Sequence, residues 1–372
     1  MAETVKTQNT TIKVRLHPTE KQAELFDKTF DCCRFLWNRM LSEQEEFYAA
    51  TGVHVLPTPA HYKKEFPFLK EVDSQALVSV HQNLRRAFQK YFDQPEVYRH
   101  PVYKKKKDNK NSYTIYRSTQ SKSLHITRDA VRLPKLGLVK AVFHRRPLHW
   151  WTLKSATVSK STSGNYYCAL MFEYPVKERS PVVPTEKTTI GLHESLSHFY
   201  VDNDGKRVEL PKQIGKNQEK LNKMQRKLSR MEQSSKNYEQ QLRKIQTLYE
   251  HIANQRKDFI HKESHRIAND WDAVCVRDSE LISMKGFGQF RICLQYKLKR
   301  QGKHYISVDR FFPCSRTCHN CGYVHEPFQR VGKKWHCPGC GATLVHDTNA
   351  ARNLKQQGLA KLVDTQEVKR SA

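Results

Sequence analysis

Two Cys-x-x-Cys pairs near the C-terminus constrain this chain more than any other sequence feature. Cys318/Cys321 and Cys337/Cys340 are separated by a linker of the length typical of a zinc ribbon. Because four thiolates leave no open coordination position, we predict that a structural Zn²⁺ ion is bound by Cys318, Cys321, Cys337 and Cys340. The segment that follows the second pair places Asp347 at the start of a predicted helix. A single carboxylate does not make a metal-dependent active site, so partners for Asp347 are expected elsewhere in the chain.

The charge of the chain favours a polyanionic partner. Its 372 residues include 65 Lys+Arg and 37 Asp+Glu, which gives a formal net charge of +28. The positive residues are spread along the sequence rather than gathered in a tail, as in proteins that bind nucleic acid. No apolar run approaches the roughly 18 residues of a membrane span, and no secretory segment follows Met1. We expect a cytoplasmic protein in a reducing compartment, with no membrane partner.

The N-terminal half predicts a small antiparallel barrel with an inserted helical lobe. Residues 11–16 alternate as a strand, and Pro18-Thr19 opens a helix whose apolar positions recur with a period near 3.6. A second amphipathic helix covers Val72–Phe92. His125–Tyr174 reads as short strands separated by turns. The predicted domains are residues 1–18 and 101–180 for the barrel and residues 19–100 for the helical lobe.

A run of four lysines precedes a segment rich in polar and aromatic residues. Such a run alone also fits a solvated loop. Tyr113 and Tyr116 are interleaved here with Lys110 and Arg117, a pattern suited to phosphates beside stackable bases. The resulting candidates for nucleic-acid binding are Lys104, Lys105, Lys106 and Lys107.

The C-terminal half predicts strands alternating with helices, which indicates an α/β core. Strands are expected at Thr188–Leu192, Ala273–Val276 and His304–Phe311, and helices across Lys216–Asn269 and Phe287–Lys299, with a break at Gln233–Ser235. Basic residues crowd the long helices with too few acids to pair them, which favours phosphate contacts over a merely solvated face. The candidates there are Lys223, Arg226, Lys227, Arg230, Arg256 and Lys257.

Taken in order, these motifs resemble those of the TnpB family, the transposon-encoded RNA-guided nucleases related to type V CRISPR effectors. The resemblance covers nearly the whole chain and rests on VRLHPTEKQ, CRFLWNRML, LNKMQRKLSRMEQSSKN, IANQRKDFIHK, VDRFFPCSRTCHNCG, WHCPGCG and HDTNAARN. It implies an α+β multidomain fold: a wedge β-barrel with an inserted helical recognition lobe, then an RNase H-like (RuvC) α/β domain interrupted by a zinc ribbon. The implied ranges are 185–313 and 343–366 for the RuvC-like domain, 314–342 for the ribbon and 367–372 for a tail.

The resemblance also implies three carboxylates that hold two Mg²⁺ ions in the RuvC-like domain. At the corresponding positions this chain has His193, Arg277 and Asp347. Neither imidazole nor guanidinium suits Mg²⁺, so we expect a degenerate RuvC site with no catalytic Mg²⁺. An ion pair with Asp347 is favoured for Arg277 over a contact with a nucleic-acid phosphate. His193 and His346 are expected to be tolerated substitutions rather than a general base and a metal ligand.

Three other acids could stand in for the missing ones. Glu194 and Asp278 follow His193 and Arg277 directly, so on a regular strand they point to the opposite face. Glu280 could reach the site only through a bulge or an early strand end. An active site rebuilt from these displaced carboxylates is therefore the alternative.

The resemblance places recognition of the target duplex on the helical lobe, at the helix that begins at Val72. The candidates for reading a short motif in that duplex are Ser74, Gln75, Ser112 and Tyr113.

A degenerate site in an otherwise intact body resembles the TnpB-like nuclease-dead repressors (TldR). We therefore expect an RNA-guided, DNA-binding transcriptional repressor and not an enzyme, with an active RNA-guided DNA endonuclease as the alternative. The implied partners are a guide RNA of the omega-RNA type and double-stranded target DNA beside a short motif. The protein is expected to be a monomer within the ribonucleoprotein, associated with the nucleoid in a prokaryotic cytoplasm.

Overall fold

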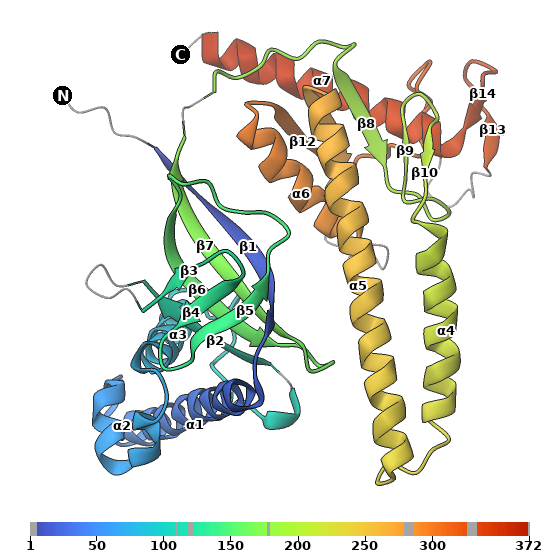
Figure 1. Ribbon diagram of the computed structural model, residues 1–372. Helices are drawn as coiled ribbons and strands as arrows, with labels where there is room; N and C mark the ends of the chain where they lie inside the picture. Colours follow the sequence, from blue (N-terminus) through green and yellow to red (C-terminus); the bar gives the residue numbers. More distant parts are fainter. Residues whose placement is uncertain are drawn as a thin grey trace. The chain divides into compact units, whose positions relative to one another are not determined.

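The computed structural model describes residues 6–108, 110–117, 123–176, 179–278, 286–325 and 333–370, with side chains up to residue 362. The chain divides into two compact units, residues 1–177 and 178–372, and each is described by itself (Figure 1). Among the helices of these described ranges, none combines the length and the apolar character that a membrane crossing needs.

The first unit is built on a curled antiparallel sheet of seven strands in the order β2-β6-β7-β1-β5-β4-β3. Strand β1 lies at its centre, because it pairs with β7 along most of its length and with β5 at its C-terminal end. The strands are β1 (Thr7–His17), β2 (Asn111–Tyr116), β3 (His125–Ile126), β4 (Ala130–Leu133), β5 (Gly137–Val142), β6 (Thr152–Lys160) and β7 (Tyr166–Pro175).

The predicted barrel is a half-barrel in the part of the chain that the structure describes. Its outer strands β2 and β3 do not pair with each other. Helices α1 (Glu20–Thr51) and α3 (Ser74–Asp93) pack against β2 instead, and their apolar faces share one core with the sheet. The helices therefore fill the space that a closed barrel fills with its own side chains. Helix α2 (Pro59–Glu65) and two short 3₁₀ turns, Pro67–Lys70 and Lys106–Asp108, complete this unit.

Helix α1 begins where the sequence predicts. The Thr19 hydroxyl oxygen accepts a hydrogen bond from the Gln22 backbone N–H, and the Gln22 side-chain oxygen accepts one from the Thr19 backbone N–H, so both bonds of a capping box are present. Cys33 and Trp37 are buried along its apolar stripe and belong to the core of this unit. The long helix ends at Gly52 in the left-handed conformation that glycine adopts without strain.

The second unit contains the expected α/β core. Its five-stranded sheet has the order β10-β9-β8-β11-β12, and β8, β11 and β12 run parallel. The strands are β8 (Thr189–His193), β9 (Tyr200–Asp202), β10 (Arg207–Val208), β11 (Ala273–Arg277) and β12 (His304–Val308). Both faces are covered: α5 (Lys236–Asp270) and α6 (Phe287–Arg300) pack on one, and α7 (His346–Arg370) packs on the other.

Glycines let α7 approach this sheet closely. A Cβ on Gly191 of β8 would lie 2.1 Å from the carbonyl oxygen of Ala351, and a Cβ on Gly358 of α7 would lie 2.1 Å from Cys275 Sγ of β11. Neither position has room for a larger residue. The N-terminal turn of α7 is therefore held at a fixed place beside the end of β8.

Helices α4 (Lys212–Leu228) and α5 form a long hairpin that projects from this sheet (Figure 1). The predicted break between them is confirmed: α4 ends at Leu228, and Ser235 caps α5 by accepting a hydrogen bond from the Tyr238 backbone. A small apolar cluster between the helices includes Leu221 and Ile245. The basic residues therefore point outward from the pair.

Candidate functional site

The parallel strands β8 and β11 end side by side and carry two of the three predicted RuvC-like positions. Cys275 pairs with Gly191 and Val276 with Leu192, so His193 and Arg277 terminate neighbouring strands at the same edge of the sheet. The carboxyl ends of parallel strands are the usual place for a functional site in an open α/β sheet. The first turn of α7 brings Asp347 to this edge, where its Oδ1 lies 3.9 Å from His193 Nε2.

Asp347 is surrounded by hydrogen-bonding partners. Ser195 Oγ donates to its Oδ2 at 2.6 Å, and the Nδ1 atom of His346 lies 2.9 Å from its Oδ1. Burial alone would raise the pKa of this carboxyl, but the contacts with Ser195 and His346 and the nearby His193 hold its pKa below the ordinary value. Asp347 is therefore a carboxylate at neutral pH.

His193 is held in its neutral form. Burial lowers the pKa of its imidazole to about 4; Asp347 opposes this effect, whereas His346 and Arg277 add to it. A neutral imidazole is the form that binds metal ions. Sequence reasoning treated this histidine as a tolerated substitution and did not place it against His346. That contact depends on how α7 crosses the end of β8.

Arg277 does not form the ion pair that the sequence favoured. Across the described residues, the groups within ion-pair distance of Asp347 are His193 and His346. The Arg277 guanidinium instead lies near Cys314: burial raises the pKa of that thiol, and the guanidinium opposes the rise. The prediction was wrong because Ser195 and His346 already take the positions around the carboxylate.

Of the displaced acids, Glu194 and Asp278 do not join this cluster. Among the described residues, the His, Cys, Asp and Glu groups that converge within metal-binding reach are the four ribbon cysteines and the trio His193, His346 and Asp347. Asp278 points to solvent and pairs with Arg291 at 3.6 Å. Glu280 lies outside the described residues. One carboxylate with two imidazoles does not fit the all-oxygen coordination that Mg²⁺ demands.

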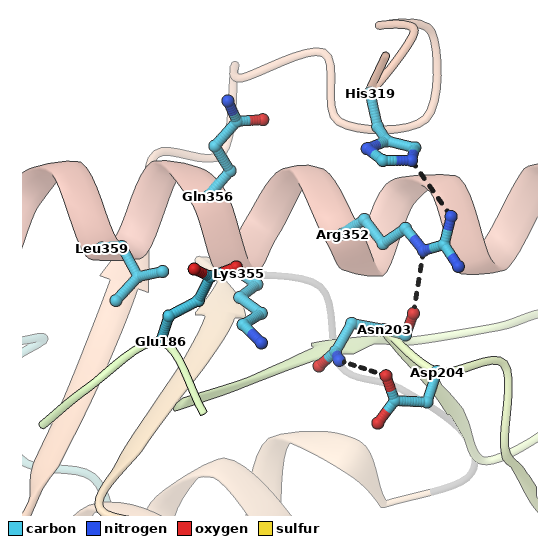
Figure 2. Close-up of a pocket in the computed structure, with 8 residues that line it drawn as sticks. All are labelled: Glu186, Asn203, Asp204, His319, Arg352, Lys355, Gln356 and Leu359. Carbon is cyan, nitrogen blue, oxygen red and sulfur yellow. Dashed lines mark hydrogen bonds between the residues drawn. The ribbon is translucent and has the colours of Figure 1, made fainter. Parts of the chain in front are cut away.

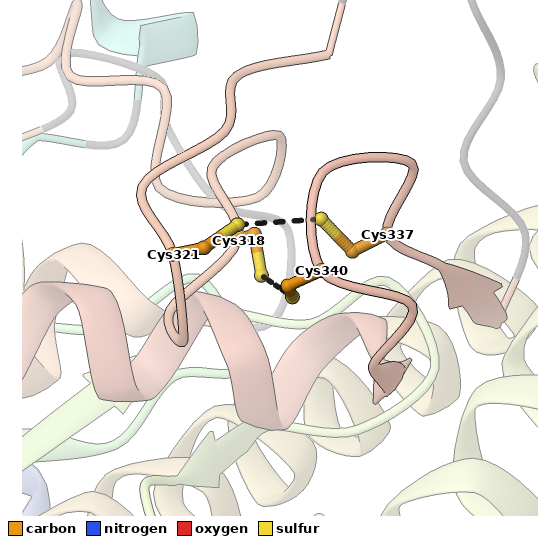
Figure 3. Close-up of side chains that lie close together, drawn as sticks. All are labelled: Cys318, Cys321, Cys337 and Cys340. Carbon is orange, nitrogen blue, oxygen red and sulfur yellow. Dashed lines mark hydrogen bonds between the residues drawn. The ribbon is translucent and has the colours of Figure 1, made fainter.

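The four ribbon cysteines form a cluster with the geometry of a zinc site (Figure 3). The Sγ atoms of Cys318 and Cys340 lie 3.7 Å apart, and those of Cys321 and Cys337 lie 3.5 Å apart. Sulfur ligands on a tetrahedral zinc ion are separated by about 3.8 Å, because each Zn–S bond is about 2.3 Å long. These residues fit Zn²⁺. The ribbon also contains β13 (Lys334–His336) and β14 (Thr343–Val345), which pair antiparallel.

Two asparagines of α7 attach the ribbon to the α/β core, and sequence reasoning missed both. Asn349 Nδ2 donates to the Thr317 carbonyl at 2.7 Å, and Asn353 Nδ2 donates to the carbonyls of Thr317 and Cys314. Their spacing of four places them on one helix face. That spacing within the HDTNAARN motif was the signal that could have found them.

Arg352 forms a second link, beside a cavity of 520 Å³ (Figure 2). Its Nε donates to the Asn203 carbonyl at 3.0 Å, and its Nη1 lies 3.0 Å from His319 Nε2. Burial and the Arg352 guanidinium lower the pKa of His319, so its ring is neutral and accepts this hydrogen bond. The β9–β10 turn, α7 and the first cysteine knuckle are thus joined through one side chain.

The predicted phosphate contacts on the α4–α5 hairpin lie where phosphates could reach them. Lys223, Arg226, Lys227, Arg230 and Lys257 are exposed, and Arg256 is half-buried. None of these six forms an ion pair with another described residue. Their charges are therefore free to act on a polyanion.

The candidates of the first unit are divided between surface and core. Lys105 and Lys107 are exposed, Lys106 lies 3.7 Å from Asp31, and Lys104 Nζ lies 3.7 Å from the centroid of the Trp37 ring. Lys104, Lys105, Ser112 and Tyr113 line a pocket of 130 Å³.

The prediction that Tyr113 contacts nucleic acid is wrong. Its side chain is only 3% exposed, and its ring packs 5.5 Å from that of Phe30, so it is not available for contact with a base. The alternation of β2 turns Tyr113 inward, toward α1 and α3. Ser74 and Gln75 lie in the first turn of α3, where Ser74 Oγ accepts a hydrogen bond from Lys63 Nζ.

Three family models match this chain. They are the "Cas12f1-like, TNB domain" over residues 287–354, the OrfB/IS605 model described as "Probable transposase" over residues 172–286, and the OrfB/IS605 "Helix-turn-helix domain" over residues 8–52. In the structure, the last of these ranges forms β1 and the single long helix α1.

Relatives are similar over nearly the whole length. A Streptomyces pristinaespiralis protein named "Putative RNA-guided DNA endonuclease" is 28% identical over 370 residues, which cover 94% of this chain and 89% of the relative. The Escherichia coli K12 protein InsQ, with the same description, is 27% identical over 384 residues, which cover 94% and 92%. A Cas12f1 chain solved in a complex with sgRNA and target DNA aligns with a TM-score of 0.59 and 11% identity over 94% of this chain and 99% of that one, which shows a common fold.

These relatives overturn one prediction. The residues at the RuvC-like positions led us to classify the chain as a non-enzyme, but relatives covering 94% of it are named as endonucleases, so that classification is wrong. It rested on three positions, whereas the similarity extends from the N-terminal strand to the ribbon. On the family models and these relatives together, the chain belongs to the TnpB/IS605 family of RNA-guided DNA endonuclease-like proteins.

Proposed function

We propose that this family member binds a guide RNA, uses it to bind a complementary DNA duplex beside a short motif, and represses transcription by holding that target. Pairing between guide and target strand supplies the sequence specificity, and the protein reads only the short motif. An R-loop held over a promoter obstructs RNA polymerase. The protein acts as one copy per ribonucleoprotein, on the nucleoid of a prokaryotic cell.

The side chains at the ends of β8 and β11 carry this proposal. Of the three carboxylates that a two-Mg²⁺ site requires, the edge offers Asp347, together with the imidazoles of His193 and His346 and the guanidinium of Arg277. This set favours retention of a DNA backbone over two-metal hydrolysis. Arg277 adds a fixed positive charge beside the strands' ends, where a phosphate is the natural counter-charge.

The surface of the α4–α5 hairpin supports the same proposal. Helix α4 carries six Lys or Arg residues and one acid, Glu219. Exposed cations without partners bind nucleic-acid backbones by releasing counterions. The zinc site of the ribbon is expected to be structural, because its four thiolates leave the ion no position for a substrate.

Guide-directed cleavage of DNA is the second candidate function. The names of the two relatives favour it, and the cluster of His193, His346 and Asp347 offers ligands for one divalent ion at the place where the family resemblance puts the reaction. The two functions share guide binding and target recognition. They differ in whether the target leaves the complex intact.

One experiment separates the candidates. The protein is purified from its own source with bound RNA, the RNA is sequenced, and the complex is mixed with duplex DNA that matches the guide, in Mg²⁺, Mn²⁺ or Zn²⁺. Bound and cut fractions are measured in the same samples, and transcription from the matching promoter is measured in cells. Guide-dependent binding of intact DNA with lowered transcription supports repression. Guide-dependent cutting that Asp347→Ala abolishes supports the endonuclease, and recovery of random cellular RNA overturns guided binding altogether.

A further inference from the structure

Three side chains from two elements converge at the edge of the sheet in the second unit. His193 ends β8, and His346 and Asp347 form the first turn of α7. One ligand atom from each lies within 4.8 Å of the other two. We propose that these three residues form a binding site for a single borderline divalent cation such as Zn²⁺, distinct from the zinc site of the ribbon. The proposal concerns the protein without nucleic acid and does not depend on the function proposed above.

The ligand set selects the ion. Two imidazole nitrogens and one carboxylate oxygen are a common set for zinc and for other late first-row metals, whereas Mg²⁺ requires oxygen ligands. The replacement of carboxylates by imidazoles therefore changes which metal this edge prefers. It does not simply remove a metal site.

The separations between the ligand atoms suit such an ion. Nitrogen and oxygen ligands about 2.0–2.1 Å from a tetrahedral zinc ion lie about 3.3 Å from one another. Asp347 Oδ1 lies 2.9 Å from His346 Nδ1 and 3.9 Å from His193 Nε2, so the two contacts fall on either side of this value. A metal ion would take the place of the proton between Asp347 and His346. The three ligand atoms lie within 4.8 Å of one another, and rotation of the side chains would bring them to the separations of a tetrahedral site.

The surroundings of the cluster hold it in this arrangement. Ser195 Oγ donates to Asp347 Oδ2, which turns the other carboxylate oxygen toward the two imidazoles. Such an outer hydrogen bond is the usual support of a metal-binding carboxylate. Close packing of α7 on Gly191 fixes the helix turn that carries His346 and Asp347 against the strand that carries His193.

The charges around the cluster limit it to one ion. Arg277 ends the strand beside β8 and acts electrostatically on His193. A fixed positive charge there opposes a second cation next to the first. The side chains of the cluster are 13% exposed for His193, 30% for His346 and 26% for Asp347, so the remaining coordination positions open to solvent.

The test counts zinc ions. The full chain is purified without added RNA, stripped of loosely held metal by dialysis against a mild chelator, incubated with Zn²⁺ alone and desalted. Its zinc content is then measured by mass spectrometry. We expect two zinc ions per chain in the wild-type protein and one in His193→Ala and in His346→Gln. His336→Ala serves as the matched control and keeps two, because that ring contacts Thr343 and lies outside both clusters.

Two further measurements keep the outcome decisive. Circular dichroism and a thermal melt establish that each variant is folded, and His346→Gln tests the site at a partly exposed helix turn if His193→Ala does not fold. Co²⁺ replaces Zn²⁺ as a spectroscopic probe: sulfur-to-cobalt bands report the ribbon, and weaker visible bands report the nitrogen and oxygen site. One zinc ion in the wild-type chain, or two in both folded variants, would overturn the proposal. Neither result would bear on guided DNA binding.

Discussion

Ser195 Oγ donates a hydrogen bond to Asp347 Oδ2 across 2.6 Å, and so joins the loop after β8 to the first turn of α7. Ser195 is only 5% exposed. The bond therefore orients a carboxylate in a place where water does not readily replace the donor. It links two segments that lie 152 positions apart in the sequence.

Replacement of this hydroxyl is expected to destabilise the protein. Ser195→Ala leaves one oxygen of a charged carboxylate without its donor, and a hydrogen bond to a charged group contributes about 1.5–3 kcal/mol. The free energy of unfolding, measured in urea, should fall by that amount. Ser197→Ala is the control, since Ser197 is exposed and does not contact Asp347. Equal effects of the two changes would contradict the role given to Ser195.

Gly191 is expected to tolerate no side chain. An alanine Cβ there would lie 2.1 Å from the Ala351 carbonyl oxygen and 2.9 Å from the Lys355 nitrogen, both of them backbone atoms of α7. Gly191→Ala should lower the free energy of unfolding by about 1–3 kcal/mol, the usual cost of overpacking. Gly215→Ala is the matched control on α4, where no atom lies within 4 Å, and it should raise stability by up to about 1 kcal/mol. A neutral Gly191→Ala would show that α7 does not pack as described.

The sequence predicted the parts of this fold that depend on local signals. Thr19 and Ser235 are side-chain caps, and both helices begin where the sequence places them. The parallel strands that end at His193 and Arg277 follow from short apolar runs separated by helices. Periodicity and capping are properties of neighbouring residues, so they can be read without the fold.

The rest depends on contacts between distant segments. His346 is near His193 only because α7 crosses the end of β8, and Arg277 is near Cys314 rather than Asp347 for the same kind of reason. The inward turn of Tyr113 likewise depends on α1 and α3 packing against β2. The type and spacing of these residues indicate which interactions each can make. The packing of distant segments decides which partner each one meets.

Glu263 is expected to make stability depend on acid pH. Burial alone would raise the pKa of this carboxyl, but hydrogen bonds donated by Arg266 and by the Tyr200 hydroxyl hold its pKa below the ordinary value. Because the pKa of Glu263 is lower in the folded state than in the unfolded state, its ionised form stabilises the fold. This stabilisation is fully present above the pKa of the unfolded state, which is about 4.3. That stability is lost as the pH falls through the lower folded pKa.

The variant Glu263→Gln tests this dependence. It should lower the free energy of unfolding at pH 7 by about 1.5–3 kcal/mol, because the charge-assisted bonds are lost. It should also flatten the decline in stability below about pH 4.3, measured by urea unfolding over a pH series. Asp270→Asn removes an exposed partner of the same Arg266 and should change neither quantity by more than about 0.5 kcal/mol. If the stability of Glu263→Gln declined in acid as steeply as that of the wild-type protein, the role given to Glu263 would be contradicted.

The basic face of the α4–α5 hairpin is expected to bind RNA through phosphates. Lys223 and Lys227 are exposed on α4 and have no ion-pair partner among the described residues, so each can displace one condensed counterion. Loss of both in Lys223→Ala/Lys227→Ala should weaken binding to RNA of any sequence. The slope of log affinity against log salt should become shallower by about 0.7–0.9 for each lysine removed. Binding to labelled single-stranded RNA, titrated at several salt concentrations, measures both quantities.

Lys262→Ala is the control, because Lys262 is already paired with Asp258 at 2.8 Å. A loss of affinity with an unchanged salt slope would place the RNA elsewhere on the protein.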